Sequence, residues 1–554
     1  MLTRADLRVF QRFFVGKIKQ CFHPDHVKRL PGVMLALEPG AGKTVTVLTA
    51  LLDLLNGFVI RKVLIVAPLL VAQTVWPQEP DEWEHLTQLR HMMQLLRVED
   101  DDPDVNAAGD AAYAEALARY QAEFELERQS EIMLGAAKGS ARTKARANLK
   151  KSPGERAEPH RLEAIAAAKA AKLAALANTD AEIHIINKEG LDWLWAHFRK
   201  GRDWPYDVMV IDDCREGRSG KRRKKGDKNQ PKKGPAPLSR WGIMAQARKR
   251  MMATIQLTGT PTPKGLQNMW GLIYLIDLGE RLGAAKTHFL NRWFNIDRDR
   301  HLTIPHAHSF GEVMGRVKDI MFSLNPEDMP QLPPYIVDPI RVKLPATVLD
   351  RYKRFKRQMV SEEYDVEAVN GGVLHGKLLQ FANGSMYREA GDDVWIHDVK
   401  IEALKLLVER LEGTPLLVAY TYQFDAERIM KAFPDAVLMR PENAVKVTRD
   451  WNADRIGLLL AHRASAGHGL NLQKGTGHMC EYGLTSDAEL YLQFLKRLLR
   501  PGRRDPVFNH VIIAEGTIDD EVFPKYLDPK IAEQVRIMQA VQVSFGGDLV
   551  DILS

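Results

Sequence analysis

The sequence is poor in cysteine and contains no long apolar run. Its three cysteines, Cys21, Cys214 and Cys480, lie far apart among 554 residues. This spacing excludes a disulfide framework and a paired-cysteine zinc site, and it favours a reducing cytoplasm. The longest apolar stretch runs from Val63 to Ala72, about half of the roughly 20 residues that a membrane helix needs. A disulfide-bonded secreted protein is thereby excluded, and no membrane span is predicted.

The chain also begins without the apolar segment of a secretory signal, since Met1 to Asp6 are largely polar. The 17 histidines show no metal-ligand spacing. We therefore expect a cytoplasmic protein that has no membrane partner and no zinc site.

Basic charge is concentrated in one segment. The chain has a net charge of +7, and residues Arg215 to Lys233 hold ten Lys or Arg against Glu216 and Asp227. This basic loop, bounded at 214–240, therefore carries the whole basic excess. Such a loop either contacts a polyanion such as nucleic acid or remains solvated without a fixed contact, and both interpretations stay open.

Short apolar runs alternate with helical stretches in two series. A chain of this length suits two or three domains, and buried β-branched runs separated by helices predict parallel sheets covered on both faces. The expected strands are 33–37, 62–67, 182–186, 208–211, 254–257, 416–419, 456–460 and 508–513, and the expected helices are 44–55, 401–410 and 488–500. We therefore predict an α/β fold with two lobes.

The domain division follows from where these series stop. Lobe 1 is expected at 1–277, with a helical hairpin inserted at 101–178, and lobe 2 at 335–554. Residues 278–334 lack a clear alternation and are expected to form a helical connector that ends in Leu332-Pro333-Pro334.

The expected hairpin is rich in alanine and charge. Tyr113, Leu117, Tyr120 and Phe124 are spaced to form one apolar helical stripe. Gly135 to Gly154 is predicted as the turn, and a returning helix would carry Leu162, Ile165, Leu173 and Leu176. The hairpin is either a solvated spacer or an arm that binds a partner.

A phosphate-binding loop is predicted at Glu38 to Thr44, between an expected strand and an expected helix. Gly40 and Gly42 allow phosphate oxygens to approach the backbone N–H groups at the helix N-terminus. Lys43 would reach the β and γ phosphates, and the Thr44 hydroxyl would help to hold Mg²⁺. The strict pattern has glycine where this chain has Leu37, so a structural turn is the alternative.

Two acids follow the expected strand 208–211. An acid at the carboxyl end of a buried parallel strand lies beside a phosphate site. Asp212 would anchor Mg²⁺ through water, and Asp213 would polarise the attacking water. The alternative is a pair of turn-forming acids at a strand end.

These segments, in this order, resemble the Swi/Snf-type ATPases of helicase superfamily two, in the compact form that bacteriophages encode. The resemblance runs from about Leu7 to Asp528, apart from the hairpin and the basic loop. Gln11 resembles the glutamine that reads adenine in this family. Further matches in lobe 1 are Leu64 to Pro68, Trp76, Trp83, Asn187, Glu189, Leu257 to Pro261, Asn268 and Trp270.

The second lobe carries the later motifs of the same family. The matches are Leu378 to Gln380, Asn383, Gly384, Ala464 to Gly467, Gly469 to Gln473, the set Gln493, Arg497, Arg500 and Gly502, and Glu515 to Asp520. Arg497 and Arg500 are three apart on an expected helix and would share one face. Alone, such a pair would be expected to face solvent. The resemblance implies that they act as arginine fingers on the γ-phosphate.

The resemblance implies two RecA-like P-loop lobes that bind ATP and Mg²⁺. Asp212, Asp213, Arg497 and Arg500 are the expected catalytic residues, and Thr44 and Asp212 the expected magnesium ligands. The expected ATP-binding residues are Gln11, Gly40, Gly42, Lys43, Thr44 and Gly469. The implied track is duplex DNA, contacted mainly through its backbone, and the implied location is the cytoplasm of a bacterial host. No protein partner is indicated.

The expected function is a DNA-dependent ATPase that translocates on duplex DNA. Two departures from the family bear on it: Asp213 stands where the family has glutamate, and Arg503 where it has glutamine. The shorter Asp213 must approach water differently, and Arg503 adds charge near an expected phosphate path. A strand-separating helicase, or a nucleotide-gated DNA-binding module with weak hydrolysis, are the alternatives.

Overall fold

The computed structural model divides into two compact units, Met1–Arg90 with Asn187–Ser554, and His91–Ile186. The residues that the structure describes are 1–38, 40–98, 102–134, 152–198, 200, 202–213, 238–259, 261–262, 265–297, 302–325, 328, 332–361, 363–388, 391–440, 442–463, 472–500, 503 and 505–543.

The first lobe is built on an eight-stranded sheet in the order β20-β9-β1-β6-β5-β2-β4-β3, and its registered pairs run parallel. The strands are β1 Gly32–Ala36, β2 Val63–Ala67, β3 Met93–Leu95, β4 Ile183–Asn187, β5 Val208–Asp212, β6 Ala253–Thr258, β9 Met321–Leu324 and β20 Gln542–Val543. All residues of β1, β2 and β6 are buried. Near-continuous apolar strands are typical of a sheet covered on both faces, which confirms the predicted fold class.

The helices of the first lobe include α1 and α2, which both contribute residues at the predicted phosphate loop. They are η1 Arg4–Asp6, α1 Val9–Gln20, α2 Lys43–Asn56, α3 Leu69–Glu82, η2 Glu84–His91, η3 Lys188–Gly190, α7 Leu191–His197, α8 Arg240–Arg248, η5 Leu266–Asn268 and α9 Met269–Asp277. Ten of the 14 residues of α2 are buried. This helix is therefore a core element of the lobe.

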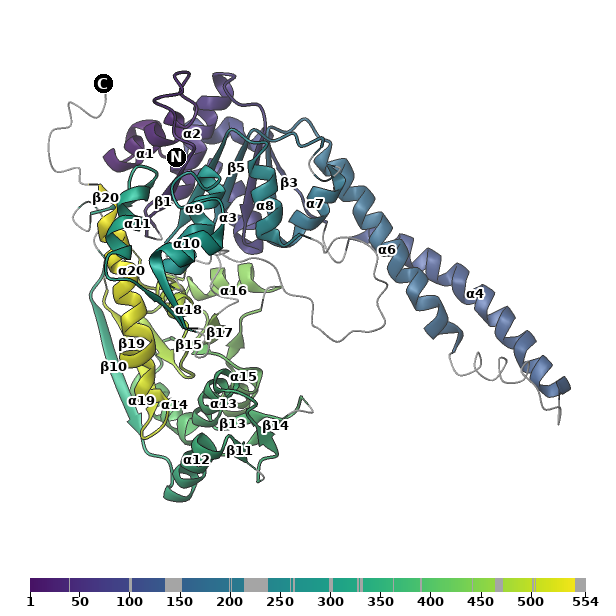
Figure 1. Cartoon of the computed structure of the whole chain (residues 1–554). Coiled ribbons are helices and arrows are strands. Elements are labelled where there is room, and N and C mark those ends of the chain that lie inside the picture. The colour runs from purple at the N-terminus through teal and green to yellow at the C-terminus, as the bar shows by residue number, and fades with distance from the viewer. Residues whose placement is uncertain are drawn as a thin grey trace. The chain divides into compact units, whose positions relative to one another are not determined.

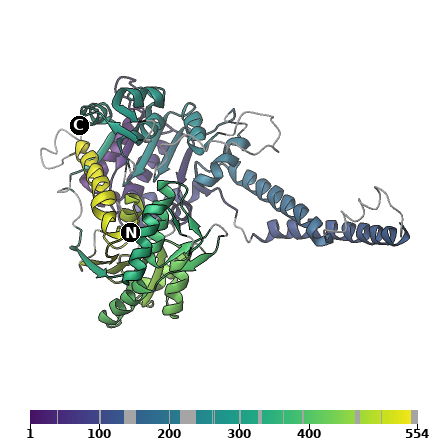
Figure 2. The same ribbon diagram turned by 60° about the horizontal axis from the view of Figure 1, so that its bottom comes forward.

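The second unit contains the predicted helical hairpin, together with the parallel pair β3 and β4. Its helices α4 (Pro103–Leu134) and α6 (Pro153–Ala177) lie side by side in both views (Figures 1 and 2). A Cβ on Gly109 would lie 2.4 Å from Ile165, so the helices approach closely there. Leu162, which was expected among the apolar residues of the returning helix, lies on α6 but is 57% exposed.

The second helix of the hairpin, α6, begins at Pro153, before the predicted end of the turn at Gly154. Ser152 caps α6 by accepting a hydrogen bond from the Glu155 N–H at 3.2 Å, and Pro153 and Gly154 form the first turn. Proline is favoured there because its missing N–H would lack a helical partner anyway. The rest of the predicted turn lies outside the described residues.

The predicted connector is not purely helical. It contains α10 (Lys286–Trp293), the antiparallel pair β7 (Phe294–Asp297) and β8 (Leu302–Pro305), and α11 (Ser309–Val317). It also supplies β9, which pairs with β1 in the first sheet. Only four residues long and interrupted by Ser323, this buried strand gives no clear periodicity in the sequence.

The second lobe is built on a six-stranded sheet in the order β10-β19-β18-β15-β17-β16, again parallel. Its strands are β10 Tyr335–Val342, β15 Leu416–Tyr420, β16 Val437–Leu438, β17 Leu458–His462, β18 His478–Glu481 and β19 Val507–Ala514. Pro339 lies within the edge strand β10, where a missing N–H is tolerated.

The helices of this lobe are α14 Val399–Arg410, α15 Gln423–Ala432, α16 Ala444–Trp451, α18 Ala488–Leu495, α19 Asp519–Glu521, the π-helix η7 Val522–Leu527 and α20 Asp528–Ala540. A smaller group lies at one end of the lobe (Figure 1). It comprises α12 Ala346–Gln358, β11 Val360–Ser361, β12 Val366–Glu367, α13 Gly371–Asn383, β13 Ser385–Tyr387 and β14 Asp393–Trp395.

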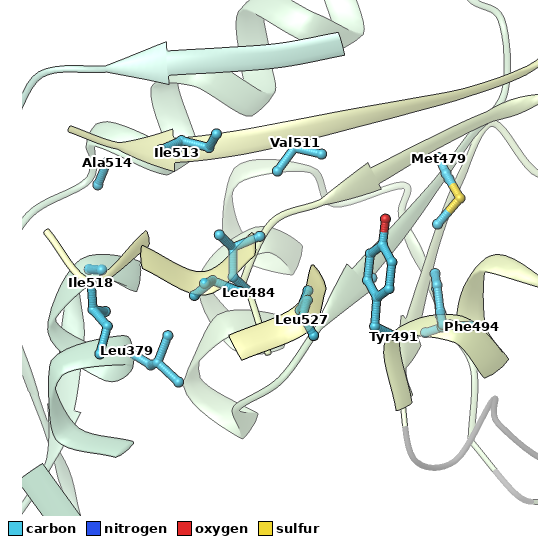
Figure 3. Packing of buried hydrophobic residues seen from close by; sticks show 14 of the residues in the cluster. Leu379, Met479, Leu484, Tyr491, Phe494, Val511, Ile513, Ala514, Ile518 and Leu527 are labelled. Carbon is cyan, nitrogen blue, oxygen red and sulfur yellow. The ribbon is translucent and has the colours of Figure 1, made fainter. Parts of the chain in front are cut away.

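Apolar packing joins the sheet of this lobe to its covering helices. Met479 and Val511 on neighbouring strands lie beside Tyr491 and Phe494 of α18 (Figure 3). Ile518 and Leu527 extend the same cluster beyond the end of β19. The helix α18, which carries Gln493 of the predicted motif residues, is thus anchored to the sheet by its apolar side.

The C-terminal end departs from the expected domain division. After α20, β20 pairs with β9 of the first sheet. The Glu533 carboxylate accepts a hydrogen bond from the Leu266 N–H at 3.0 Å. The end of the predicted lobe 2 therefore completes the sheet of lobe 1.

A buried ion pair ties α14 to the end of β19. Lys400 Nζ lies 2.7 Å from Asp519 Oδ2, with both side chains fully buried, and it donates to Asn383 Oδ1 at 3.0 Å. Asp519 Oδ2 also accepts from the Ala514 N–H at 3.0 Å. Loss of one partner leaves the other charge buried without compensation, which is strongly destabilising.

We expect Lys400→Met to lower the free energy of unfolding by about 3–5 kcal/mol, measured by urea unfolding. The double variant Lys400→Met with Asp519→Asn should recover part of this loss because the unpaired charge is gone. Lys405→Met is the control, because Lys405 pairs with Glu402 on the exposed face of the same helix. A loss no larger in Lys400→Met than in this control would contradict the assignment.

Candidate functional site

The predicted phosphate loop lies between β1 and α2, as expected. Gly40 has φ 85° and Gly42 φ 73°, the left-handed backbone that glycine adopts without a Cβ penalty. Gly42 is the N-cap of α2, so the N–H groups of the first turn, including that of Thr44, have no partner within the helix. The loop therefore presents an anion-binding helix N-terminus.

Gln11 on α1 lies directly against this loop. Its side chain accepts a hydrogen bond from the Arg8 N–H at 2.7 Å and donates to the Ala41 carbonyl at 3.4 Å. A Cβ on Gly42 would lie only 2.2 Å from Gln11 Nε2. The structure thus brings together two residues that were predicted separately to bind the nucleotide.

A cavity of about 440 Å³ opens beside the same two helices. Its lining residues are Arg4, Ala5, Leu7, Arg12, Val15 and Thr49. Thr49 is hydrogen-bonded to His85 at 2.8 Å.

Lys43 is held by the backbone at the start of its own loop. Its Nζ donates to the carbonyl oxygens of Leu37 at 2.8 Å and Glu38 at 3.2 Å. Burial lowers the pKa of Lys43 to about 8, and the nearby charges of Asp212 and Glu38 oppose this shift. The nearby oxygens and carboxylates therefore offset only part of the cost of burying the Lys43 ammonium. This favours the approach of an anionic group to the loop.

Asp212 ends β5, the strand two places from β1 in the sheet. Its Oδ2 accepts a hydrogen bond from Trp76 Nε1 at 3.0 Å. Burial raises the pKa of Asp212, while the charge of Lys43 lowers it. Asp212 and Lys43 thus interact at the carboxyl edge of the sheet, as the strand positions predicted.

Asp213 has a left-handed backbone, with φ 52°. Its carbonyl oxygen accepts a hydrogen bond from Lys188 Nζ at 2.7 Å. Lys188 lies between Asn187 and Glu189, whose side chains are hydrogen-bonded to each other at 3.1 Å. Sequence reasoning named Asn187 and Glu189 but missed Lys188, because no motif spacing marks a lysine that reaches a backbone carbonyl.

The predicted helix 488–500 ends early, and this corrects the placement of the two arginines. α18 ends at Leu495, so Arg497 and Arg500 lie in the following turn and do not share a helical face. Pro501 follows Arg500, and the residue before proline is disfavoured in the α region. Gln493 remains on α18 and donates to Glu489 at 3.1 Å.

Both arginines are withdrawn from solvent, contrary to the expectation for an ordinary surface pair. Arg497 is 7% exposed. Arg500 Nε donates to the Lys496 carbonyl at 2.8 Å, and burial lowers the pKa of Arg500 to about 10. Guanidinium groups in such surroundings are suited to bind an incoming phosphate charge.

Arg503, which was expected to add charge near a phosphate path, contacts the backbone of lobe 2. Its guanidinium donates to the carbonyl oxygens of Gln473 at 2.6 Å and Gly475 at 2.7 Å. The departure from glutamine therefore joins two segments of lobe 2, because the planar guanidinium can bridge neighbouring carbonyls.

The first motif residues of lobe 2, Leu378 to Gln380 and Asn383, lie on α13 (Gly371–Asn383). Asn383 donates to both carboxylate oxygens of Asp425 at 3.2 and 3.0 Å. Burial raises the pKa of Asp425 to about 6. Gln380 accepts a hydrogen bond from the Tyr387 N–H at 3.0 Å.

Several predicted residues lie outside the described residues. They are Pro39 of the phosphate loop, Thr260, Ala464 to Gly467, Gly469 to Asn471, Gly502 and the basic segment Arg215 to Lys233. The role of Gly469 in nucleotide binding and that of the basic loop therefore stay predictions.

Two ion pairs were missed by sequence reasoning. The carboxylate of Glu38, at the start of the phosphate loop, pairs with Lys496. Arg463, at the end of β17, pairs with Glu481 in the core of lobe 2. Each joins residues far apart in the chain, so local patterns do not predict them.

Thr44 and Asp212 supply the oxygen donors of the expected magnesium site. Within the part of the chain that the structure describes, no group of three or more His, Cys, Asp or Glu is arranged to hold a metal ion. Mg²⁺ in phosphate sites takes one or two protein ligands and completes its shell with water and substrate phosphates. The donors present therefore suit an ion that arrives with a nucleotide.

Among the described residues, no helix is both long and apolar enough to cross a membrane.

Comparisons with known proteins support a phage relationship. No family model matches the chain. Protein p41 of Acyrthosiphon pisum secondary endosymbiont phage 1 is 30% identical over 519 residues, which cover 91% of this chain and 93% of that protein. This chain belongs to the p41 family of phage proteins.

Two solved structures are similar over most of their length. The Sulfolobus solfataricus SWI2/SNF2 ATPase core in complex with dsDNA is 14% identical with a TM-score of 0.36, covering 97% of each chain. The Pyrococcus furiosus Hef helicase domain is 13% identical with a TM-score of 0.42, covering 94% of this chain and 99% of that one.

We expect Gly42→Ala to weaken ATP binding at least tenfold. The left-handed backbone disfavours any Cβ there, and the added methyl group would displace Gln11 from the loop. Gly16→Ala on α1 is the control, since a Cβ at Gly16 meets nothing within 4 Å. The measurement is ATP affinity by isothermal titration, and equal affinities of the two variants would contradict the assignment.

Proposed function

We propose that this protein is a DNA-dependent ATPase that translocates on duplex DNA. The observation that carries the ATPase part is the joint placement of Lys43, Asp212 and the left-handed Gly42 at the carboxyl edge of the first sheet. A partly buried lysine and a partly buried acid beside a glycine-built helix N-terminus suit bound nucleotide phosphates and Mg²⁺.

Each residue of the site has its own role in ATP binding and hydrolysis. Lys43 exchanges the carbonyl oxygens of Leu37 and Glu38 for phosphate oxygens of ATP, and Thr44 and Asp212 hold Mg²⁺. When bound, Mg²⁺ neutralises charge on the phosphates. Asp213 orients the attacking water, and Arg497 and Arg500 stabilise negative charge on the transferred phosphoryl group.

The DNA part of the proposal has separate support. The motif series from Gln11 to Asp520 resembles Swi/Snf-type ATPases, and Arg215 to Lys233 concentrate basic charge directly after Asp213. Contacts of such a segment with phosphates position a protein on nucleic acid without reading its sequence. Binding should therefore weaken steeply as salt concentration rises.

The short side chain of Asp213 favours one other function, a nucleotide-gated DNA-binding module with weak hydrolysis. Buried Arg497 and Arg500 favour the motor, because a protein that only binds ATP has little use for charges that act on the transferred phosphate.

The deciding measurement is ATP hydrolysis by the purified protein without nucleic acid and with duplex DNA, single-stranded DNA or RNA. We expect duplex DNA to stimulate turnover by at least tenfold, and Lys43→Ala to abolish the stimulation. Equally low turnover in all four conditions, with ATP still bound, would overturn the motor and leave the gated module. Strand displacement on a forked substrate would favour a helicase.

The affinity for ATP should depend on pH through Lys43. Since the pKa of Lys43 is lowered to about 8, its ammonium is charged below pH 8 and loses its proton above it. Bound phosphates favour the charged form, so ATP binding above pH 8 must take up a proton. We therefore expect the Kd to be flat near pH 7 and to rise up to about tenfold per pH unit above 8.

Lys43→Arg is the control for this pH dependence, because arginine stays charged throughout the range. Binding of a slowly hydrolysed ATP analogue is measured between pH 7 and 9.5. Parallel curves for the wild type and Lys43→Arg would contradict the role of Lys43 as the titrating group.

A further inference from the structure

Glu38 contacts two lysines at once. Its backbone carbonyl accepts a hydrogen bond from Lys43 Nζ at 3.2 Å, and its carboxylate pairs with Lys496. Glu38 follows β1 of the first sheet, whereas Lys496 is the C-cap of α18 on the second lobe. One residue of the phosphate loop is thereby joined to the segment that carries Arg497 and Arg500.

The surroundings distinguish this pair from ordinary surface ion pairs. The side chains of Lys496 and Glu38 are 16% and 31% exposed, so the pair is only partly screened by solvent. Exposed pairs contribute little because water competes for both charges. The Glu38–Lys496 pair therefore holds its two segments together more firmly than an exposed pair would.

The turn after α18 connects Lys496, which pairs with Glu38, to Arg497 and Arg500. Arg500 Nε donates to the Lys496 carbonyl at 2.8 Å, and the Arg497 N–H donates to the Phe494 carbonyl at 2.9 Å. Phe494 belongs to the buried core of lobe 2. The turn is thus fixed by the core on one side, and on the other by the Lys496 ion pair.

We propose that Lys496 is a positioning residue: through its ion pair with Glu38, it places Arg497 and Arg500 at the phosphate loop for catalysis. This inference rests on the proposed ATPase function and adds a residue to it. Because Arg497 and Arg500 are proposed to act on the transferred phosphoryl group, the contribution of Lys496 should appear in turnover and not in substrate affinity.

Steady-state ATP hydrolysis tests the pair in the full-length protein with saturating duplex DNA. We expect Lys496→Met to lower kcat about 10- to 100-fold, the range in which small misplacements of catalytic groups act. KM should change by less than about threefold, since an interaction made only in the transition state does not alter ground-state binding. Lys496→Arg keeps the charge and should retain most of kcat.

A double-variant cycle shows whether Glu38 is the partner. Glu38→Gln removes the carboxylate but keeps the backbone carbonyl that binds Lys43, so it should lower kcat by a similar factor. If the two residues act as one unit, the double variant should be no slower than the slower single variant. Lys405→Met, which breaks an exposed ion pair on α14, should leave kcat unchanged, and thermal unfolding of all variants controls for folding.

The outcomes separate this inference from the proposed function. A wild-type protein without DNA-stimulated turnover overturns both. An active wild type with Lys496→Met within twofold of its kcat, a loss confined to KM, or multiplicative effects of Lys496→Met and Glu38→Gln overturns the positioning role alone.

Discussion

The arrangement of the candidate site depends on Lys43, a partly buried lysine at the end of the phosphate loop. Taking an ammonium group out of water is costly unless nearby oxygens compensate. Lys43 finds two carbonyl oxygens and the charge of Asp212, and its pKa still falls to about 8. The compensation is incomplete, so a polyanionic ligand has a direct electrostatic advantage at this position. Gly42, which has no Cβ, leaves room for the Gln11 side chain beside the loop.

Opposite charges are buried in the second lobe as well, but with a different consequence. Lys400 is matched by Asp519 and Asn383, so its hydrogen-bonding capacity is used inside the lobe. A paired buried charge of this kind holds elements in one arrangement, whereas the two carbonyl oxygens around Lys43 offset the cost of its burial only in part.

The sequence predicted what local patterns encode. Apolar runs predicted β1, β2, β5, β6, β15 and β19, and the Gly-Lys-Thr segment predicted the loop before α2, since both depend on neighbouring residues. It did not predict β9, whose place beside β1 depends on a distant part of the chain. The end of α18, the carbonyl contacts of Arg503 and the Glu38–Lys496 pair likewise arise only when remote segments meet. The phosphate loop could therefore be predicted from the sequence, whereas its contact with lobe 2 through Glu38 and Lys496 could not.

The aspartate at position 213 has to be judged together with its backbone. Its φ of 52° lies in the left-handed region, where aspartate is tolerated better than most other side chains. The Lys188 ammonium binds the Asp213 carbonyl and so fixes the peptide that sets the direction of the side chain. A glutamate at this position would add reach but would fit this backbone less well. The shorter acid is thus consistent with the local conformation, and the position of the carboxylate relative to the phosphate loop follows from the turn as much as from side-chain length.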